Sequence, residues 1–345
     1  MSRHKIIRAA LEGLSLTGAA NWLPGAADAA GFVVTLHNVK RGGRAAAFDP
    51  NALLAITPEF LDRFLGHFKG RGWRFVSVDE LVAEEGAHDP RRIAVTLDDG
   101  YRDNLEHAWP IFRKHATPFT IFVCPGFAER TAELWWIALE RIIGAADALV
   151  LPGDAPTEMR ATRTPAEKQQ MFRLWTEWLT SVVDETRQRL EISALAERHG
   201  LDFVKLADEL TMDWDEVRRI AADPLCSIGA HTMTHAALAR LPMERAFREI
   251  DESVMTIEAE TGRRPTSLAF PYGYRSAAGP REAMLAERAG LATSFSTSPG
   301  FVPRSGSRHG LPRVSINGLF QQLRFLEVLL TPGLWTLRDR IKSAA

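Results

Sequence analysis

The sequence has little that would indicate a disulfide scaffold, a polyanion partner or a membrane span. It contains only two cysteines, Cys124 and Cys226, and both lie in apolar stretches typical of buried thiols. Its 42 basic and 43 acidic residues give a net charge of −1, which argues against nucleic acid as a partner. No apolar run is long enough to cross a bilayer. What is present, 46% hydrophobic and 25% charged residues, is the composition of a soluble globular protein.

The first 30 residues form a segment of their own. The basic start and Ala27-Asp28-Ala29 imitate a secretory signal, but Glu12 interrupts the apolar core that a signal needs. We therefore expect a cytoplasmic protein, with export to the periplasm as the alternative. The segment has apolar residues with the spacing of one helix face: Ile6, Ile7, Ala10, Leu11 and Leu14. This spacing predicts an amphipathic helix that packs on the domain or makes peripheral contact with a membrane.

Seven short apolar runs alternate with helical patterns along most of the chain. One run ends at His37, and the others lie at 93–97, 118–124, 226–230, 267–270, 293–297 and 313–316. A helix is predicted to begin after the cap Thr57, and another covers about 243–261. Because short apolar strands separated by helices are typical of parallel sheets covered on both faces, we predict an α/β fold. Seven such strands favour a barrel of β/α units over an open doubly wound sheet.

Residues 131–223 lack this alternation of apolar runs and helical patterns. They show no strand pattern and have helix-length stretches at 133–145, 165–198 and 213–222, which predicts an all-helical insertion. The expected organisation is an N-terminal amphipathic helix (1–30), a barrel (31–130 and 224–325), the insertion (131–223) and a C-terminal helical tail (326–345). Four tryptophans of the insertion either pack its helices or form a platform that stacks on sugar rings or a partner: Trp135, Trp136, Trp175 and Trp178.

Two adjacent carboxylates, Asp98 and Asp99, follow the apolar run at 93–97 directly. Active sites of parallel β/α folds gather at this edge of the sheet. Because adjacent side chains on an extended backbone diverge, one carboxylate could bind a metal while the other reaches a water molecule. Alternatively, the pair is a turn with an Asp helix cap.

A pair of imidazoles follows another strand end. His231 and His235 lie four residues apart in IGAHTMTH. Two imidazoles and one carboxylate make a three-ligand metal site with open positions. Taken alone, the two histidines could also be an ordinary surface or core pair, but their occurrence together with the Asp pair at strand ends favours a metal site.

These motifs resemble those of the polysaccharide deacetylases, the NodB-homology domain of carbohydrate esterase family four. TLDDGY is similar to the family's first motif, HTMTH to its second and AFPYGYRS to its third. The resemblance covers roughly residues 31–125 and 225–316 and implies a distorted (β/α)7-type barrel. It also implies Asp98 as the catalytic base, Asp99, His231 and His235 as ligands of a divalent ion, and the Tyr272 backbone N–H as an oxyanion donor.

The general acid departs from the usual family pattern. Typical members have a histidine late in the domain, where this sequence offers only His309 in a loop. His37, at the end of the first strand, resembles the acid of circularly permuted members, so we assign the acid to His37 with His309 as the alternative. Arg313, on the last strand, could pair with Asp98 or orient His37, or form a purely structural ion pair.

The resemblance implies a metal-dependent hydrolase that removes N-acetyl groups from an amino-sugar polymer, oligosaccharide or glycolipid. Zinc is the expected ion, and the ligand set also suits cobalt, nickel or iron. We assign substrate contacts to Tyr101, Pro271, Trp135 and Trp136. Two other functions are weighed: a metal-dependent glycosyltransferase, which gives the histidines no role, and a catalytically silent glycan-binding module. The sequence indicates no oligomeric state.

Overall fold

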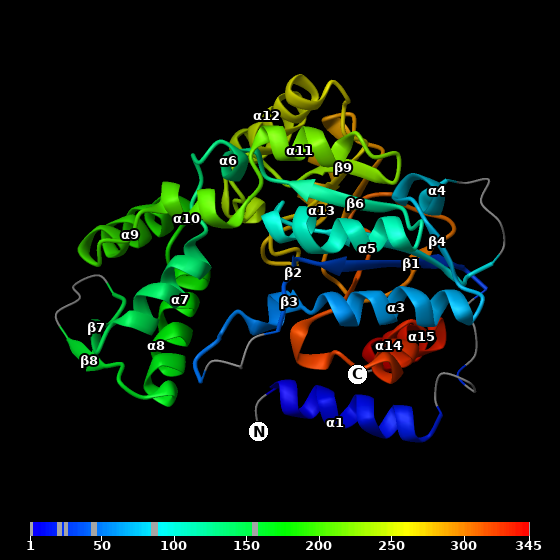
Figure 1. The fold of residues 1–345 in the computed structure, drawn as a ribbon, viewed down its shortest axis with the longest axis horizontal. Coiled ribbons are helices and arrows are strands. Elements are labelled where there is room, and N and C mark those ends of the chain that lie inside the picture. Colours follow the sequence, from blue (N-terminus) through cyan, green and yellow to red (C-terminus); the bar gives the residue numbers. More distant parts are fainter. Residues whose placement is uncertain are drawn as a thin grey trace.

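The predicted strands lie side by side in one sheet of the computed structural model, which describes residues 3–18, 23, 27–42, 47–83, 89–153 and 158–344 (Figure 1). The sheet contains β1 (Ala29–Leu36), β5 (Arg92–Leu97), β6 (Phe119–Val123), β9 (Cys226–Ala230), β10 (Ser267–Ala269), β11 (Thr293–Phe295) and β13 (Val314–Ser315). In the order β13-β1-β5-β6-β9-β10-β11, each strand is hydrogen-bonded in parallel to the next. The prediction of an α/β barrel of parallel strands is therefore confirmed.

The barrel is distorted where it closes. A single bridge between Phe295 and Leu311 links β11 to the segment that leads into β13. The short strands β4 (Arg74–Val76) and β12 (Val302–Pro303) extend the sheet beside β5 and β1, and β12 runs antiparallel. A separate two-stranded sheet joins β2 (Asn38–Val39) and β3 (Ala55–Ile56). These additions leave the carboxyl ends of the seven parallel strands on one edge.

Helices cover the outer face of the sheet (Figure 1). They are α3 (Pro58–Gly70), α4 (Val78–Val82), α5 (Trp109–Lys114), α11 (Trp214–Ala221), α12 (Met243–Thr261) and α13 (Pro280–Arg288). The α3 helix begins as predicted, because the Thr57 side chain accepts a hydrogen bond from the Phe60 N–H and Pro58 occupies the first turn. Its apolar stripe joins the strand side chains in the main core.

The insertion lies to one side of the barrel (Figure 1). It contains α7 (Trp135–Ala145), α8 (Pro165–Glu177), α9 (Glu185–Arg198) and α10 (Phe203–Leu210), and α6 (Pro125–Ala128) leads into it. The single helical stretch expected at 165–198 is divided by a wide helical turn at Trp178–Val182, after which Asp184 caps α9. Two further details differ from the expected all-helical insertion at 131–223. The strands β7 (Ala148–Val150) and β8 (Met159–Ala161) form a short antiparallel ribbon, and α11, which was expected within the insertion, packs into the barrel core through Val217 and Ile220. Three-residue strands carry too little alternation to stand out in a sequence.

Helix α1 (Arg3–Leu16) lies beside the C-terminal helices α14 (Leu323–Leu329) and α15 (Pro332–Ala344) (Figure 1). Its predicted buried stripe is only partly correct. Leu11 packs on Phe325 and Val328, whereas Ile6 is 56% exposed and Ile7 is 37% exposed. The seven-residue α14 covers only the later part of the stripe. None of the helices within the described ranges is long and apolar enough to cross a membrane.

Candidate metal centre and active site

The predicted polar residues meet because the strands are in register at their carboxyl ends. Leu36 pairs with Leu97, so the next residues, His37 and Asp98, follow at the same level of the sheet. The same edge receives His231, whose N–H donates to the Val123 carbonyl oxygen just after β9. Segments far apart in the sequence therefore deliver their side chains to one place, as parallel β/α folds do.

Asp99, His231 and His235 form a buried three-ligand cluster. Their ligand atoms all lie within 4.8 Å of one another. The Nε2 atoms of His231 and His235 are 3.2 and 3.3 Å from Asp99 Oδ1. Burial alone would raise the pKa of Asp99, but the two imidazoles outweigh burial and hold the pKa well below its usual range. The carboxylate is therefore ionised and available as a ligand.

The chemistry of these atoms fits a cation. His231 Nδ1 lies 2.7 Å from the Ala269 carbonyl oxygen, which can only accept, so Nδ1 carries a hydrogen and Nε2, which faces Asp99, is the nitrogen that can bind a cation. Asp99 Oδ1 is buried and has no hydrogen-bond partner within the described residues. Acceptor atoms that face one another in this way are stabilised by a shared cation, and two imidazoles with one carboxylate are a common set for zinc.

Asp98 forms a buried bidentate ion pair with Arg313. Arg313 Nη1 and Nη2 donate to the two carboxylate oxygens at 2.7 and 2.8 Å. The Arg313 Nε donates to the Ser296 carbonyl oxygen, so the guanidinium is fixed on both sides. Burial would raise the pKa of Asp98, but the Arg313 charge leads the effects that lower it. Asp98 is thus held as a carboxylate, and of the roles considered for Arg313 the pairing with Asp98 is the one observed.

The two candidate acids have different positions. His37 lines the same cavity as Asp98, Asp99 and the two metal-site histidines. His309 does not line this cavity. It lies in a loop, where its Nδ1 is 3.3 Å from the Ser294 hydroxyl oxygen. The geometry therefore favours His37 over His309 as the proton donor.

Several residues in or beside the Asp99–His231–His235 cluster have strained backbone conformations. Six non-glycine residues within the described ranges have positive φ, and four of them are Asp99, Thr232, His235 and Tyr272. Such conformations cost on the order of 1–3 kcal/mol each and persist where the surroundings determine them. None of the hydrogen bonds found among the described residues uses the Tyr272 N–H. Tyr272 also lines the cavity, which makes this N–H a candidate donor to a ligand there.

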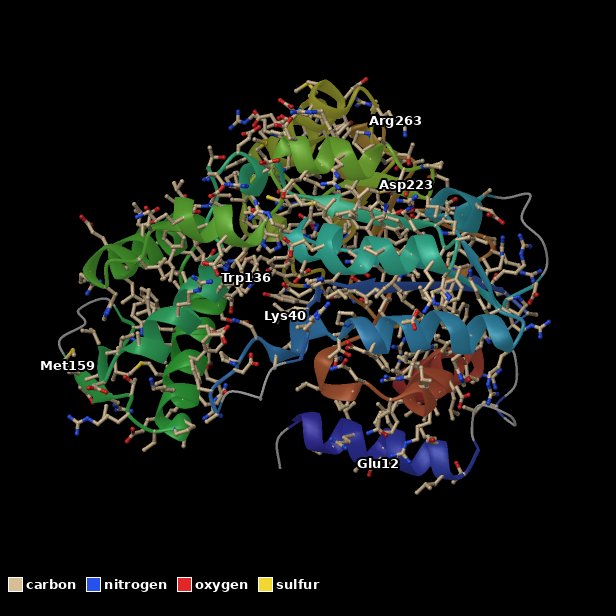
Figure 2. All side chains as sticks on the ribbon, in the orientation of Figure 1. Glu12, Lys40, Trp136, Met159, Asp223 and Arg263 are labelled. Atoms are coloured by element: carbon tan, nitrogen blue, oxygen red, sulfur yellow. The ribbon has the colours of Figure 1, made fainter. Side chains whose placement is uncertain are left out.

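A cavity of about 680 Å³ lies between the barrel and the insertion. Trp135 and Trp136, from the first turn of α7, form part of its wall, and Figure 2 shows Trp136 where the insertion meets the barrel. Their indole N–H groups donate to the hydroxyls of Tyr272 and Tyr101, at 2.8 and 3.2 Å. The two tryptophans thus both pack the interface and face the cavity, whereas Trp175 and Trp178 belong to the core of the insertion.

Two predicted substrate contacts do not fit the structure. Tyr101 is 1% exposed and does not line the cavity. Tyr101 supports Trp136 instead, because the Tyr101 hydroxyl accepts a hydrogen bond from the Trp136 indole N–H. Pro271 is buried as well and is absent from the cavity wall. Both residues belong to motifs beside the site, but their side chains are covered by their neighbours.

Sequence reasoning missed several residues of the site. Thr35 donates to Asp98 Oδ2 at 3.3 Å, and the Thr96 hydroxyl accepts from Arg313 at 3.2 Å. Each threonine lies two residues before His37 or Asp98, hence on the same strand face, and the repeated VTL could have indicated them. From the insertion, Phe172, Thr180 and Ser181 line the cavity. No sequence pattern distinguishes these three from other residues on helices.

The chain is similar to a known protein family in sequence and to solved structures in fold. A family profile described as polysaccharide deacetylase matches residues 85–173 and 175–291, more than half of the chain. The fold is similar to the Streptococcus pyogenes deacetylase PplD in complex with acetate, with a TM-score of 0.55 and 14% identity over 88% of this chain and 97% of that one. For IcaB from Ammonifex degensii the TM-score is 0.54, with 16% identity over 87% of this chain and 96% of that one.

The BpsB deacetylase domain from Bordetella bronchiseptica gives a TM-score of 0.53 and 16% identity, over 85% of this chain and 97% of that one. At these identities the similarity to solved structures establishes the fold alone. No curated protein matches the sequence.

Proposed function

The chain belongs to the polysaccharide deacetylase family, and from this membership we propose that it hydrolyses N-acetyl groups of an amino-sugar glycan with the help of a divalent cation. The observation that carries the proposal is one cavity that contains both the Asp99–His231–His235 cluster and the ion-paired Asp98. A glycosyltransferase would have no use for two imidazoles around Asp99.

Asp99, His231 and His235 would hold the cation, and zinc is the ion that this set suits best. Cobalt, nickel and iron are also compatible with two imidazoles and one carboxylate. A divalent ion bound there would polarise the acetyl carbonyl and lower the pKa of a water molecule in the site. The Ala269 carbonyl oxygen keeps His231 in the tautomer that offers Nε2.

Asp98 is the proposed general base. It is ionised at neutral pH because the Arg313 charge lowers its pKa, and both carboxylate oxygens are held in place by the bidentate pair. A carboxylate oxygen takes a proton from the attacking water while the water oxygen forms a bond with the acetyl carbon. Arg313 pairs with Asp98 and does not line the cavity, so its proposed role is to position the base and keep it charged.

His37 and Tyr272 are proposed to complete the reaction. The Tyr272 N–H donates a hydrogen bond to the oxygen that becomes negative when the water adds to the carbonyl. His37 gives a proton to the sugar nitrogen as the C–N bond breaks, which yields acetate and a free amine. Both residues line the cavity with Asp98, which supports these assignments.

The walls of the cavity support a carbohydrate as the substrate class. Trp135, Trp136 and Phe172 contribute aromatic surface, and Thr180 and Ser181 contribute hydroxyls that can bond to a sugar. We therefore propose an N-acetylated carbohydrate as the ligand, whether in a polymer, an oligosaccharide or a glycolipid.

Acetate release from a panel of N-acetylated glycans tests this proposal. Chelator-treated protein should release no acetate, and added Zn²⁺ or Co²⁺ should restore release without any nucleotide sugar. Glycan binding that is indifferent to chelator, with no acetate released from any substrate, would instead support a silent binding module. Transfer that depends on a nucleotide sugar would support a glycosyltransferase.

A further inference from the structure

The two imidazoles of the cluster are held in different ways. His231 is fixed by its Nδ1–H hydrogen bond to the Ala269 carbonyl oxygen at the end of β10. His235 Nδ1 is buried and has no hydrogen-bond partner within the described residues. Apart from the approach of its Nε2 to Asp99, the His235 ring packs against aromatic rings, with its centroid 4.9 Å from those of both Trp136 and Tyr272. Its orientation therefore depends on the backbone that carries it.

That backbone is strained. Thr232 and His235 have φ values of 62° and 57°, which side chains with a Cβ adopt only at a cost. Thr234, directly before His235, is bound from the barrel side by Glu249 on α12. The Thr234 N–H and hydroxyl donate to the two Glu249 carboxylate oxygens at 2.8 and 2.7 Å. The Met233 N–H donates to the Glu249 carbonyl oxygen at 2.8 Å, so α12 holds one side of the loop.

The other side of the loop is held by the insertion. Arg189, on α9, donates from Nη2 to the Thr234 carbonyl oxygen and hydroxyl, both at 2.8 Å. Its Nη1 donates at 2.6 Å to Glu133, just before α7. The Arg189 and Glu133 side chains are largely shielded from solvent, at 24% and 23% exposed. The Thr234 hydroxyl thus donates to Glu249 and accepts from Arg189, with both of its roles used.

We propose that Arg189 is a positioning residue for the metal centre: the insertion fixes Thr234 and thereby sets the orientation of His235 toward Asp99. The inference rests on the proposed function, since it assumes that the Asp99–His231–His235 cluster binds a divalent cation. It also assigns the insertion a role beyond the cavity wall, because Arg189 adds contacts from α9 to a loop that Glu249 and the Gly126 N–H already hold from the barrel side.

Zinc affinity of the full chain tests the inference, measured by competition with a chromophoric chelator. Replacing residues that orient metal ligands typically weakens binding 10- to 100-fold, so Arg189→Ala should lower zinc affinity by about that factor. Arg189→Lys should recover part of it, because one ammonium can still donate to Thr234 but cannot also reach Glu133 as a planar fork does. The Co²⁺ absorption spectrum should change in Arg189→Ala as the His235 geometry relaxes.

Arg141→Ala is the matched control. Arg141 also pairs with a glutamate of the insertion, Glu209, at 2.9 and 2.7 Å, but it does not touch the 232–235 loop. Its loss should leave zinc affinity within about threefold of that of the unmodified chain.

Should Arg189→Ala fail to fold, Thr234→Val removes the hydroxyl contacts to Arg189 and Glu249 while keeping the side-chain shape, and it should weaken zinc binding in the same range. Zinc affinity within about threefold of the unmodified chain in a folded Arg189→Ala, or in Thr234→Val, would overturn the inference. An unmodified chain that binds no zinc and releases no acetate would contradict the proposed function instead.

Discussion

Barrel residues reach the cavity from the ends of hydrogen-bonded strands, whereas insertion residues reach it from helices and the turns beside them. The barrel contributes Asp98, Asp99 and His231, which are titratable and almost fully buried. The insertion contributes Trp135, Trp136 and Phe172, which are aromatic and shape the wall. In Figure 2 the insertion extends from Trp136 at the junction to Met159 at its far end.

We infer from this difference that the barrel carries the reacting groups and the insertion the groups that select the substrate. A strand end fixes a side chain through the sheet register, so reacting groups placed there need few further supports. Helices of the insertion can vary without disturbing that register, which suits groups that select the substrate. Arg189 is an exception, because it lies in the insertion but contacts the barrel loop that carries His235.

The largest effect is expected for Asp98→Asn in the barrel. The amide cannot act as a base, so kcat should fall on the order of 10² to 10⁴. Zinc affinity should stay within about tenfold of the unmodified chain, because Asp98 is not part of the ligand set. Acetate release and chelator competition measure the two quantities, and a circular dichroism spectrum controls for folding, since Arg313 loses its charged partner. Turnover within about threefold of the unmodified chain would show that another group is the base.

A second comparison separates the candidate acids. His37→Ala should reduce kcat on the order of 10², because the departing nitrogen loses its proton donor. His309→Ala should leave acetate release unchanged, because His309 does not line the cavity. The opposite pattern, with His309→Ala inactive, would contradict the assignment to His37.

The smallest effect is expected for Phe172→Leu in the insertion. The substitution removes ring surface from the cavity wall and the edge contact with Phe48 at 6.3 Å. KM for a glycan should rise on the order of 10-fold with kcat nearly unchanged, because only uniform binding is lost. Leu190→Ala, at a 66% exposed position on α9, is the control. A large fall in kcat for Phe172→Leu would break the proposed division between chemistry and selection.

Sequence patterns predicted the barrel because each strand and its motif are local. The apolar runs before His37, Asp98 and His231 needed only the parallel-sheet rule to bring those residues together. The sequence left several roles open for Arg313. Only the structure shows that it pairs with Asp98, because the two residues are 215 positions apart in the sequence.

The remaining features depend on contacts that periodicity does not encode. Tyr101 and Pro271 lie in site motifs but are covered by neighbours, and motif position alone carries no information on exposure. Ile6 and Ile7 match a helix stripe, yet the partner helix is too short to cover them. The hydrogen bonds from Arg189 to Thr234 connect an insertion helix to a barrel loop. No pattern in the sequence of either segment predicts that contact.

We propose that Asp99, His231 and His235 share one cation beside a charged Asp98. Anomalous diffraction at the zinc edge, from crystals of the zinc-loaded chain, would locate that cation. One strong peak should lie within bonding distance of an Asp99 carboxylate oxygen and of Nε2 of both histidines, with the Asp98–Arg313 pair intact next to it. If a zinc-loaded crystal has no peak among these three side chains, they do not form the proposed metal site.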